Sequence, residues 1–466
     1  MSYRVPQHID SNKIFIVNRS EIQGRLDPKM ALYNRKVQNW AYPKVRLKDI
    51  LLAKPQYGAA ESGVARTNKL SPRYLRITDI DEYGLISHDD LGATANTLED
   101  QYILHANDLL IARSGATVGK AYIHKDCPYT CFFAGYLIRF IINPLKALPD
   151  YIFAFTQSNT YKEWVNAIQR PSGQPNINAE EYQSLEIPMP PVDIQEKVVS
   201  LIRKAYSEKK SKDLENQQLL DSIDTYLLDE LGITLPEVHN ELKDRIFLMK
   251  RSELEGRFDP TVYKDGVKLI SPKWDNVKLS KVALVNPSGA YKGQAVDTPI
   301  SFVPMEVVDE TFSEITTKGE TTIAQSSGFT KFREGDLLWA KITPCMQNGK
   351  SAIARNLTNG LGCGSTEFFV LCPKDQRLSI EYLHVILHMK CVRDTAMLYF
   401  GGSAGQQRVP ASFLENFNIP LPPIEKQVEI ANHVYELRQQ AKGLQEEGMR
   451  ILEEAKLEVE QMILRK

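Results

Sequence analysis

The sequence has only six cysteines among its 466 residues, and no stretch approaches the roughly 20 uninterrupted apolar residues of a membrane-spanning helix. So few cysteines in a chain of this length exclude a disulfide-rich scaffold. The first residues, Met1 to Pro6, lack the apolar core of a signal peptide. These absences predict a soluble protein of the cytoplasm with no membrane partner.

The chain also lacks an excess of either charge. Its net charge is −1, with 42% hydrophobic and 25% charged residues, which is ordinary for a globular protein. Residues 191–231 hold 9 acidic and 6 basic residues, so the acidic excess lies partly there and the globular parts are weakly basic. This distribution permits contact with DNA but does not demonstrate it.

Metal-binding patterns are missing as well. Cys127 and Cys131 are four positions apart, and neither belongs to a Cys-x-x-Cys pair with a matching second half. The sequence therefore favours inert buried thiols over a zinc site. His384 and His388 share a helical face, but Val385 stands where a metalloprotease has glutamate, so they are interpreted as packing residues.

Cofactor motifs fail in the same way. Residues 113–120 resemble a P-loop, but only three residues separate the two glycines and Ala121 replaces the Ser or Thr. The glycine-rich stretch 401–405 follows a predicted helix instead of a strand, which is wrong for a methyl-donor loop. No nucleophile–base pair or carboxylate cluster stands out. The sequence predicts no catalytic residue, no metal and no cofactor, and hence a chain that is not an enzyme.

The most informative feature is a junction that occurs twice. Ile187–Gln195 (IPMPPVDIQ) and Ile419–Gln427 (IPLPPIEKQ) lie 232 residues apart, and each opens a long helical pattern. Proline suits the first turn of a helix and keeps the preceding residue extended. Residues 19–28 match residues 251–260 at the same offset, so the chain is a tandem duplication.

The duplication predicts the domain organisation. We expect a first recognition domain at 1–190, a central long helix at 191–231, a second domain at 232–420 and a C-terminal long helix at 421–466. Within the domains, short β-prone runs such as Asp108 to Ala112 alternate irregularly with helical patterns, of which Leu148 to Ile168 and Ile380 to Leu398 are the longest. This mixture indicates an α+β fold.

The two long helical patterns carry apolar residues at spacings of three and four with charges between them, so each needs a partner surface. Each stripe can cover its own domain, or the two helices can pack on each other because their lengths match. At 1.5 Å per residue, about 40 residues span roughly 60 Å.

Two tandem units that each end in Ile-Pro-Met/Leu-Pro-Pro-x-x-x-Gln and a long helix resemble the specificity (S) subunit of type I restriction-modification systems. The resemblance covers nearly the whole chain. It implies two α+β target-recognition domains held by an antiparallel, coiled-coil-like helix pair. It also implies binding to double-stranded DNA, two methyltransferase subunits and motor-nuclease subunits, with S-adenosylmethionine and ATP on those partners.

The repeat also sorts candidate DNA-binding residues. Positions that both halves share suit scaffold or phosphate contacts, whereas base readout belongs where they diverge, such as 51–75 against 283–301. Arginine, lysine, asparagine and glutamine in the glycine-containing loops can reach phosphates or base edges. The candidates are Arg113, Lys120, Arg170, Gln174, Asn176, Lys341, Lys350, Gln406, Gln407 and Arg408.

Two alternatives remain at this stage. One is a two-domain scaffold that joins proteins and never touches DNA; salt-dependent binding to random duplex would exclude it. The other is an enzyme whose site escapes recognition, which requires activity from the isolated chain.

Overall fold

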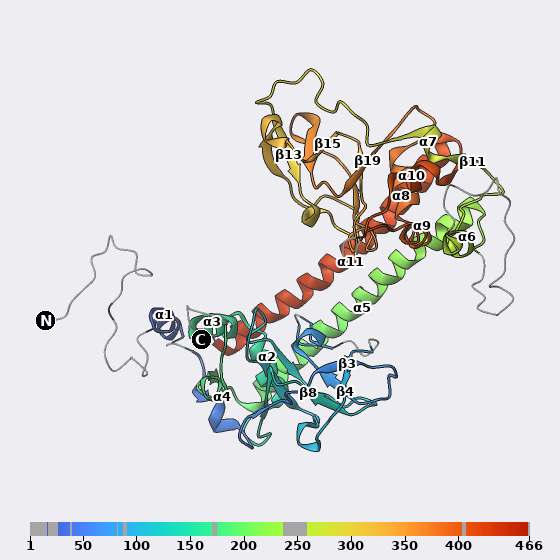
Figure 1. Cartoon of the computed structure of the whole chain (residues 1–466). Helices are drawn as coiled ribbons and strands as arrows, with labels where there is room; N and C mark the ends of the chain where they lie inside the picture. The colour runs from blue at the N-terminus through green and yellow to red at the C-terminus, as the bar shows by residue number, and fades with distance from the viewer. Residues whose placement is uncertain are drawn as a thin grey trace. The chain divides into compact units, whose positions relative to one another are not determined.

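The computed structural model describes residue 16 and residues 27–37, 40–81, 83–86, 91–169, 175–235, 259–402 and 407–464. Residue contacts divide the chain into two compact units, Met1–Ser211 with Glu447–Lys466 and Lys212–Glu446 (Figure 1). Each long helix therefore contributes one half to each unit. The four-part division expected from the sequence stays a prediction. None of the helices in the described residues is long and apolar enough to cross a membrane.

The first unit alternates short strands and helices before the first long helix. Its elements are α1 (Pro28–Lys36), β1 (Lys44–Arg46), β2 (Gln56–Tyr57), β3 (Gly63–Ala65), β4 (Arg73–Leu75), β5 (Ala93–Ala95), β6 (Asp108–Ala112), β7 (Ala121–Ile123), β8 (Cys131–Phe133), β9 (Leu137–Ile141), α2 (Pro149–Thr156), α3 (Asn159–Ile168), α4 (Ala179–Gln183), β10 (Glu186–Pro188) and α5 (Val192–Leu231).

Strand β6 is the centre of the first unit. It pairs antiparallel with β7 and β9 in a sheet of order β2-β9-β6-β7. Leu109 and Ile111 face a core shared with α2 and α3, whereas Leu110 and Ala112 face a second core shared with β4 and β8. Alternate side chains of a strand point to opposite faces, so a strand covered on both sides is apolar throughout. The strand predicted at 108–112 is confirmed.

The second unit repeats this order. Its elements are α6 (Pro260–Asp265), β11 (Asp275–Lys278), α7 (Leu279–Val282), β12 (Ala283–Val285), β13 (Pro299–Val303), β14 (Gly319–Thr322), β15 (Thr330–Arg333), β16 (Leu337–Ala340), β17 (Ser351–Ile353), β18 (Leu361–Gly364), β19 (Phe368–Pro373), α8 (Ile380–His388), α9 (Lys390–Met397), α10 (Ala411–Asn416), β20 (Asn418–Leu421) and α11 (Ile424–Leu464).

The sheet of the second unit has the matching order β12-β19-β16-β17. Strand β16 takes the place of β6, with Leu337 and Trp339 toward the helices and Leu338 toward a core shared with β13 and β15. The ends of the repeat also match, since β1 pairs with β10 and β11 pairs with β20, both antiparallel. The predicted α+β class is confirmed.

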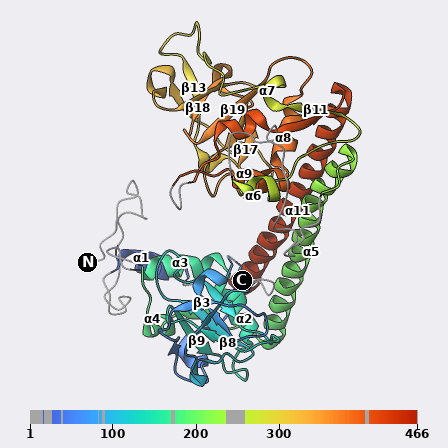
Figure 2. The ribbon, with the colours of Figure 1, turned by 45° about the vertical axis from the view of Figure 1, so that its right-hand side comes forward.

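The two long helices pack on each other in each unit. In the first unit, Val198 and Ile202 of α5 share a core with Leu452 and Val459 of α11. In the second unit, the first half of α11 lies beside the second half of α5 (Figure 2), and Lys426 Nζ lies 2.7 Å from Glu230 Oε2. Early residues of one helix thus meet late residues of the other. The antiparallel pair predicted from the resemblance is confirmed.

The helical pattern at Leu148 to Ile168 is not one helix. It is broken between α2 and α3, where the Ser158 side chain accepts a hydrogen bond from the Tyr161 N–H and caps α3. The pattern at Ile380 to Leu398 is likewise broken at Met389, whose backbone has φ −51° and ψ 137°. A capping serine competes with helix continuation, and both breaks turn a second helix onto the core.

The repeated glutamine of the junction locks the first long helix onto its unit. Gln195 is 1% exposed. Its Oε1 accepts a hydrogen bond from the Leu148 N–H at 2.9 Å, and its Nε2 donates to the Pro190 carbonyl at 2.9 Å. Tyr151 adds a hydrogen bond from its hydroxyl to the Pro188 carbonyl. The start of α5 is thus tied to the start of α2.

Gln427 does the same in the second unit, where it is fully buried. Its Oε1 accepts from the Ser379 N–H at 2.9 Å at the start of α8, and its Nε2 donates to the Pro422 carbonyl at 2.8 Å. Tyr382 donates to the Pro420 carbonyl at 2.9 Å. Only an uncharged side chain with both a donor and an acceptor satisfies these backbone groups, which explains why both junctions carry glutamine.

We expect Gln195→Ala to lower the melting temperature of the chain. The substitution leaves the Leu148 N–H and the Pro190 carbonyl without their partner, at about 1–3 kcal/mol for each buried group. Thermal unfolding followed by circular dichroism measures the loss. Gln217→Ala is the matched control, because Gln217 is exposed on the same helix and its Nε2 donates to Asp221, one turn further along that helix. Equal melting temperatures for the two variants would contradict this role.

Candidate functional site

Most of the described candidate residues lie where β6 or β16 ends. In the first unit, Arg113 follows β6 directly. Its N–H donates to the Tyr136 carbonyl at 2.9 Å, and its carbonyl accepts from the Ile177 N–H at 2.8 Å. The segment after α3 therefore crosses the end of the sheet and brings Asn176 beside Ser114. Two candidates more than 60 positions apart in the sequence become neighbours.

Arg113 and Asn176 line one groove of about 990 Å³ in the first unit. Arg76 and Tyr136 line it as well, and the Tyr57 ring lies 4.8 Å from the Arg113 guanidinium. Tyr136 is 67% exposed, so the groove offers an aromatic face as well as cationic groups. Sequence reasoning missed Arg76, Tyr136 and Tyr57, because strand pairing brings them to Arg113 and leaves no pattern along the sequence.

The second unit builds the same crossing with other side chains. Lys341 follows β16, donates its N–H to the Glu367 carbonyl at 2.9 Å and accepts from the Val409 N–H at 2.9 Å. The Thr343 N–H donates to the Gln407 carbonyl at 3.0 Å, as the Gly115 N–H donates to the Pro175 carbonyl at 3.0 Å in the first unit. Gln407 therefore takes the place of Pro175, and Arg408 that of Asn176.

Arg408 is held by a carboxylate. Its Nε and Nη2 donate to the two oxygens of Glu367 at 2.9 and 2.8 Å. These hydrogen bonds lower the pKa of Glu367 and raise that of Arg408. A bidentate pair fixes the plane of the guanidinium, so Arg408 is oriented before any ligand arrives. The Lys341 ammonium, which also lowers the pKa of Glu367, lies 5.4 Å from the Phe369 ring centre.

The shared lysines have partners inside their own units. Lys120 Nζ donates to the Ile80 carbonyl at 2.6 Å, and Lys350 Nζ to the Met305 carbonyl at 3.3 Å. Both ammonium groups thus tie a strand end to a nearby turn. This contact accounts for a lysine at both positions, and a phosphate contact by either lysine stays a prediction.

Three further candidates, Arg170, Gln174 and Gln406, lie outside the described residues. The two histidines of α8, His384 and His388, are packing residues, as expected. His384 is buried with its Nε2 3.1 Å from the Ser351 hydroxyl, and burial lowers its pKa to about 3. Burial lowers the pKa of His388 as well. Both rings are therefore neutral near pH 7.

Comparison with known proteins agrees with this duplicated architecture. The sequence model of the type I restriction modification DNA specificity domain matches residues 81–225 and 273–444. The EcoEI specificity subunit of a type I restriction enzyme from Escherichia coli is 38% identical over 34% of this chain and 26% of its own length. The EcoAI specificity subunit from Escherichia coli is 32% identical over 39% of this chain and 30% of its own length. The alignments thus span less than a third of either relative.

The likeness of fold extends further than these alignments. A chain in a solved structure of a type I R-M system superimposes with a TM-score of 0.50 at 16% identity, covering 91% of this chain and 97% of that chain. The family model matches two separate segments, one in each repeat. Together these segments cover most of the sequence between the two proline-rich junctions. The chain belongs to the family of type I restriction modification DNA specificity proteins.

Proposed function

We propose that this chain is the non-catalytic subunit that gives a type I restriction-modification complex its DNA specificity. It would read a bipartite, asymmetric target and direct adenine methyltransferase and motor-nuclease subunits to it. The two relatives from Escherichia coli are named specificity subunits. S-adenosylmethionine and ATP would be bound by the partners, and the chain would supply recognition alone.

One observation carries the proposal. Each unit presents a chain segment across the end of its central strand, on the same backbone hydrogen bonds but with different side chains. Pro175 and Asn176 in the first unit correspond to Gln407 and Arg408 in the second. Reading two different half-sites requires different side chains in the two units, held by the same backbone arrangement. Two such frames in one chain suit a target with two unlike halves.

Cationic and aromatic groups at this position suit DNA better than a protein partner. Arg113 lines the groove of the first unit with Tyr136 and with Arg76, which is paired with Asp79. In the second unit, Lys341 and Arg408 both act on Glu367 and lower its pKa. Lysine and arginine neutralise phosphates, whereas asparagine, glutamine and arginine reach base edges. We therefore place DNA contacts at Arg113, Asn176, Lys341, Gln407 and Arg408, and retain Arg170, Gln174, Gln406, Lys120 and Lys350 as further candidates.

The test is binding of the chain, with its methyltransferase partner, to a fluorescent duplex over a range of salt concentrations. We expect Arg113→Ala to weaken binding and, if the guanidinium meets a phosphate, to reduce the salt slope by about one. Arg450→Ala on α11 is the control, since Arg450 is exposed and pairs with Glu454 on the same helix. No binding of the duplex at any salt concentration would favour the protein-scaffold alternative.

A further inference from the structure

The two units differ in how they hold the turn after the second strand of the central hairpin. In the second unit, this turn joins β17 to β18. Glu334 holds it, because its two carboxylate oxygens accept hydrogen bonds from the Asn356 N–H at 2.7 Å and the Leu357 N–H at 2.8 Å. A single side chain thus ties the turn to the strand hairpin.

The first unit has the same backbone hydrogen bonds at this hairpin but no carboxylate at the position of Glu334. The His124 N–H donates to the Asp108 carbonyl at 2.9 Å, and Ala354 makes the equivalent bond to Asp336 at 2.8 Å. His124 and Ala354 therefore occupy the same position. Counting back two residues from the matched aspartates places Ala106 where the second unit has Glu334. The methyl group of Ala106 cannot accept a hydrogen bond, and one end of the turn is tied to the hairpin by a different contact, from Lys125 Nζ to Asn107 Oδ1 at 2.7 Å.

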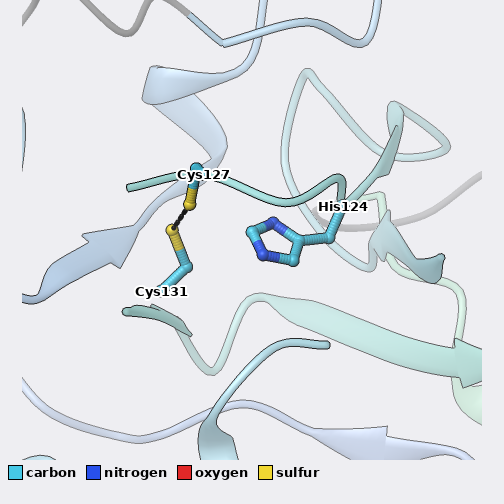
Figure 3. Close-up of side chains that lie close together, drawn as sticks. All are labelled: His124, Cys127 and Cys131. Atoms are coloured by element: carbon cyan, nitrogen blue, oxygen red, sulfur yellow. Dashed lines mark hydrogen bonds between the residues drawn. The ribbon is translucent and has the colours of Figure 1, made fainter. Parts of the chain in front are cut away.

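Three metal-ligating side chains gather at this turn. His124 follows β7, Cys131 begins β8, and Cys127 lies between them. Their candidate ligand atoms all lie within 4.8 Å of one another, and the two sulfurs are 3.5 Å apart. Figure 3 shows the imidazole ring beside the two sulfurs. Tetrahedral zinc with Zn–S bonds of about 2.3 Å separates its sulfurs by about 3.8 Å, so small side-chain movements complete the site.

The surroundings of the histidine suit a metal ligand. The Tyr122 hydroxyl lies 3.0 Å from His124 Nδ1. When the Nδ1–H donates to this oxygen, Nε2 is unprotonated and can bind a metal. His124 is 4% exposed and Cys131 1%. An open pocket of about 480 Å³, lined also by His105 and Asp126, adjoins the group and gives an ion a path of entry.

We propose that His124, Cys127 and Cys131 bind a zinc ion, with the fourth position open to a water molecule from the adjoining pocket. Two thiolates and an imidazole form a donor set that selects zinc over the hard cations magnesium and calcium. A search for paired cysteine motifs misses this group, because its third ligand is a histidine at a strand end and its cysteines are four positions apart.

The ion would act as the counterpart of Glu334. It would hold the turn that carries Tyr129, whose ring lies 4.2 Å from the Arg66 guanidinium and whose hydroxyl accepts from Arg73 Nη1 at 3.3 Å. Arg66 and Arg73 belong to the segment 51–75, in which the two halves of the chain diverge. The metal would therefore stabilise a part of the first unit that the second unit builds differently.

The experiment uses the full chain, purified under reducing conditions, freed of metal by a chelator and titrated with Co²⁺ and then Zn²⁺. We expect one Co²⁺ per chain, with thiolate-to-cobalt charge-transfer absorption that Zn²⁺ abolishes. Cys127→Ser and Cys131→Ser should each weaken binding at least tenfold, whereas Cys345→Ser in the second unit should bind as the parent does. Zinc should also raise the melting temperature of the parent.

Two results would overturn the proposal. One is a parent chain that gives no charge-transfer band and holds less than stoichiometric zinc by elemental analysis. The other is a Cys127→Ser variant that binds cobalt as tightly as the parent does. If either cysteine variant fails to fold, His124→Gln supplies the same comparison with both thiols intact. None of these readouts depends on DNA binding, so the result stands apart from the proposed function.

Discussion

Exchanging residues 15–190 for the first unit of another family member should change one half of the DNA target completely and leave the other half unaltered. Each unit has its own central strand, β6 or β16, with separate cores on its two faces. The segment that crosses the strand end is hydrogen-bonded to the backbone of its own unit, through Ile177 to Arg113 in the first and Val409 to Lys341 in the second. The two half-sites are therefore expected to be read independently.

Methylation mapping in cells that carry the exchanged chain and its partner subunits measures this result. The reciprocal exchange of residues 259–420 is the matched control and should alter only the other half. Val198, Ile202, Leu452 and Val459 complete the core of the first unit from the long helices, so the donor must present an apolar surface that fits them. A simultaneous change in both half-sites would contradict independent reading.

The second large effect concerns the long helices. If they set the distance between half-sites, inserting seven residues in α5 after Ser211 and seven in α11 after Glu446 should lengthen the DNA spacer between the half-sites. The base sequences of the half-sites should stay the same. Seven residues add about 10 Å and nearly two whole turns, which keeps the apolar stripes facing each other. With 3.4 Å per base pair, the preferred spacer should grow by about three pairs.

A two-residue insertion at Ser211 alone should abolish methylation. It rotates the following part of α5 by roughly 200° and turns its apolar residues away from α11. Ile223 and Leu227 would then leave the core that they share with Ile430 and Val434. Methylation mapping of both variants against the parent decides the matter. An active seven-residue variant with an unchanged spacer would show that the helices do not set the distance.

Local sequence was sufficient for the strand at 108–112 and for both long helices. β6 spans Asp108–Ala112, and α5 begins at Val192 directly after the double proline. Such features depend on neighbouring residues, such as a proline in the first turn or a run of apolar positions. The breaks at Ser158 and Met389 escaped the same reasoning. An uninterrupted apolar pattern favours one helix, and only packing on the core makes two short helices better.

For the candidate site as well, the sequence predicted part of the arrangement and the structure supplied the rest. Residue type and the repeat selected Arg113 and Asn176 in the first unit and Lys341 and Arg408 in the second, and the structure brings each pair to matching positions. The structure gives Lys120 and Lys350 backbone partners instead. The sequence offered no sign of those contacts, because Ile80 and Met305 lie 40 or more positions away along the chain.

By itself the sequence determined that the chain is duplicated, that each half ends in a proline-rich junction and a long helix, and which family it belongs to. These properties are encoded by spacing along one dimension. Only the tertiary structure decided why both junctions need glutamine, that Pro175–Asn176 and Gln407–Arg408 occupy equivalent places, and that His124 meets Cys127 and Cys131. Such meetings depend on strand pairing and on turns that return the chain to itself, and side chains that face each other there follow no fixed interval in the sequence.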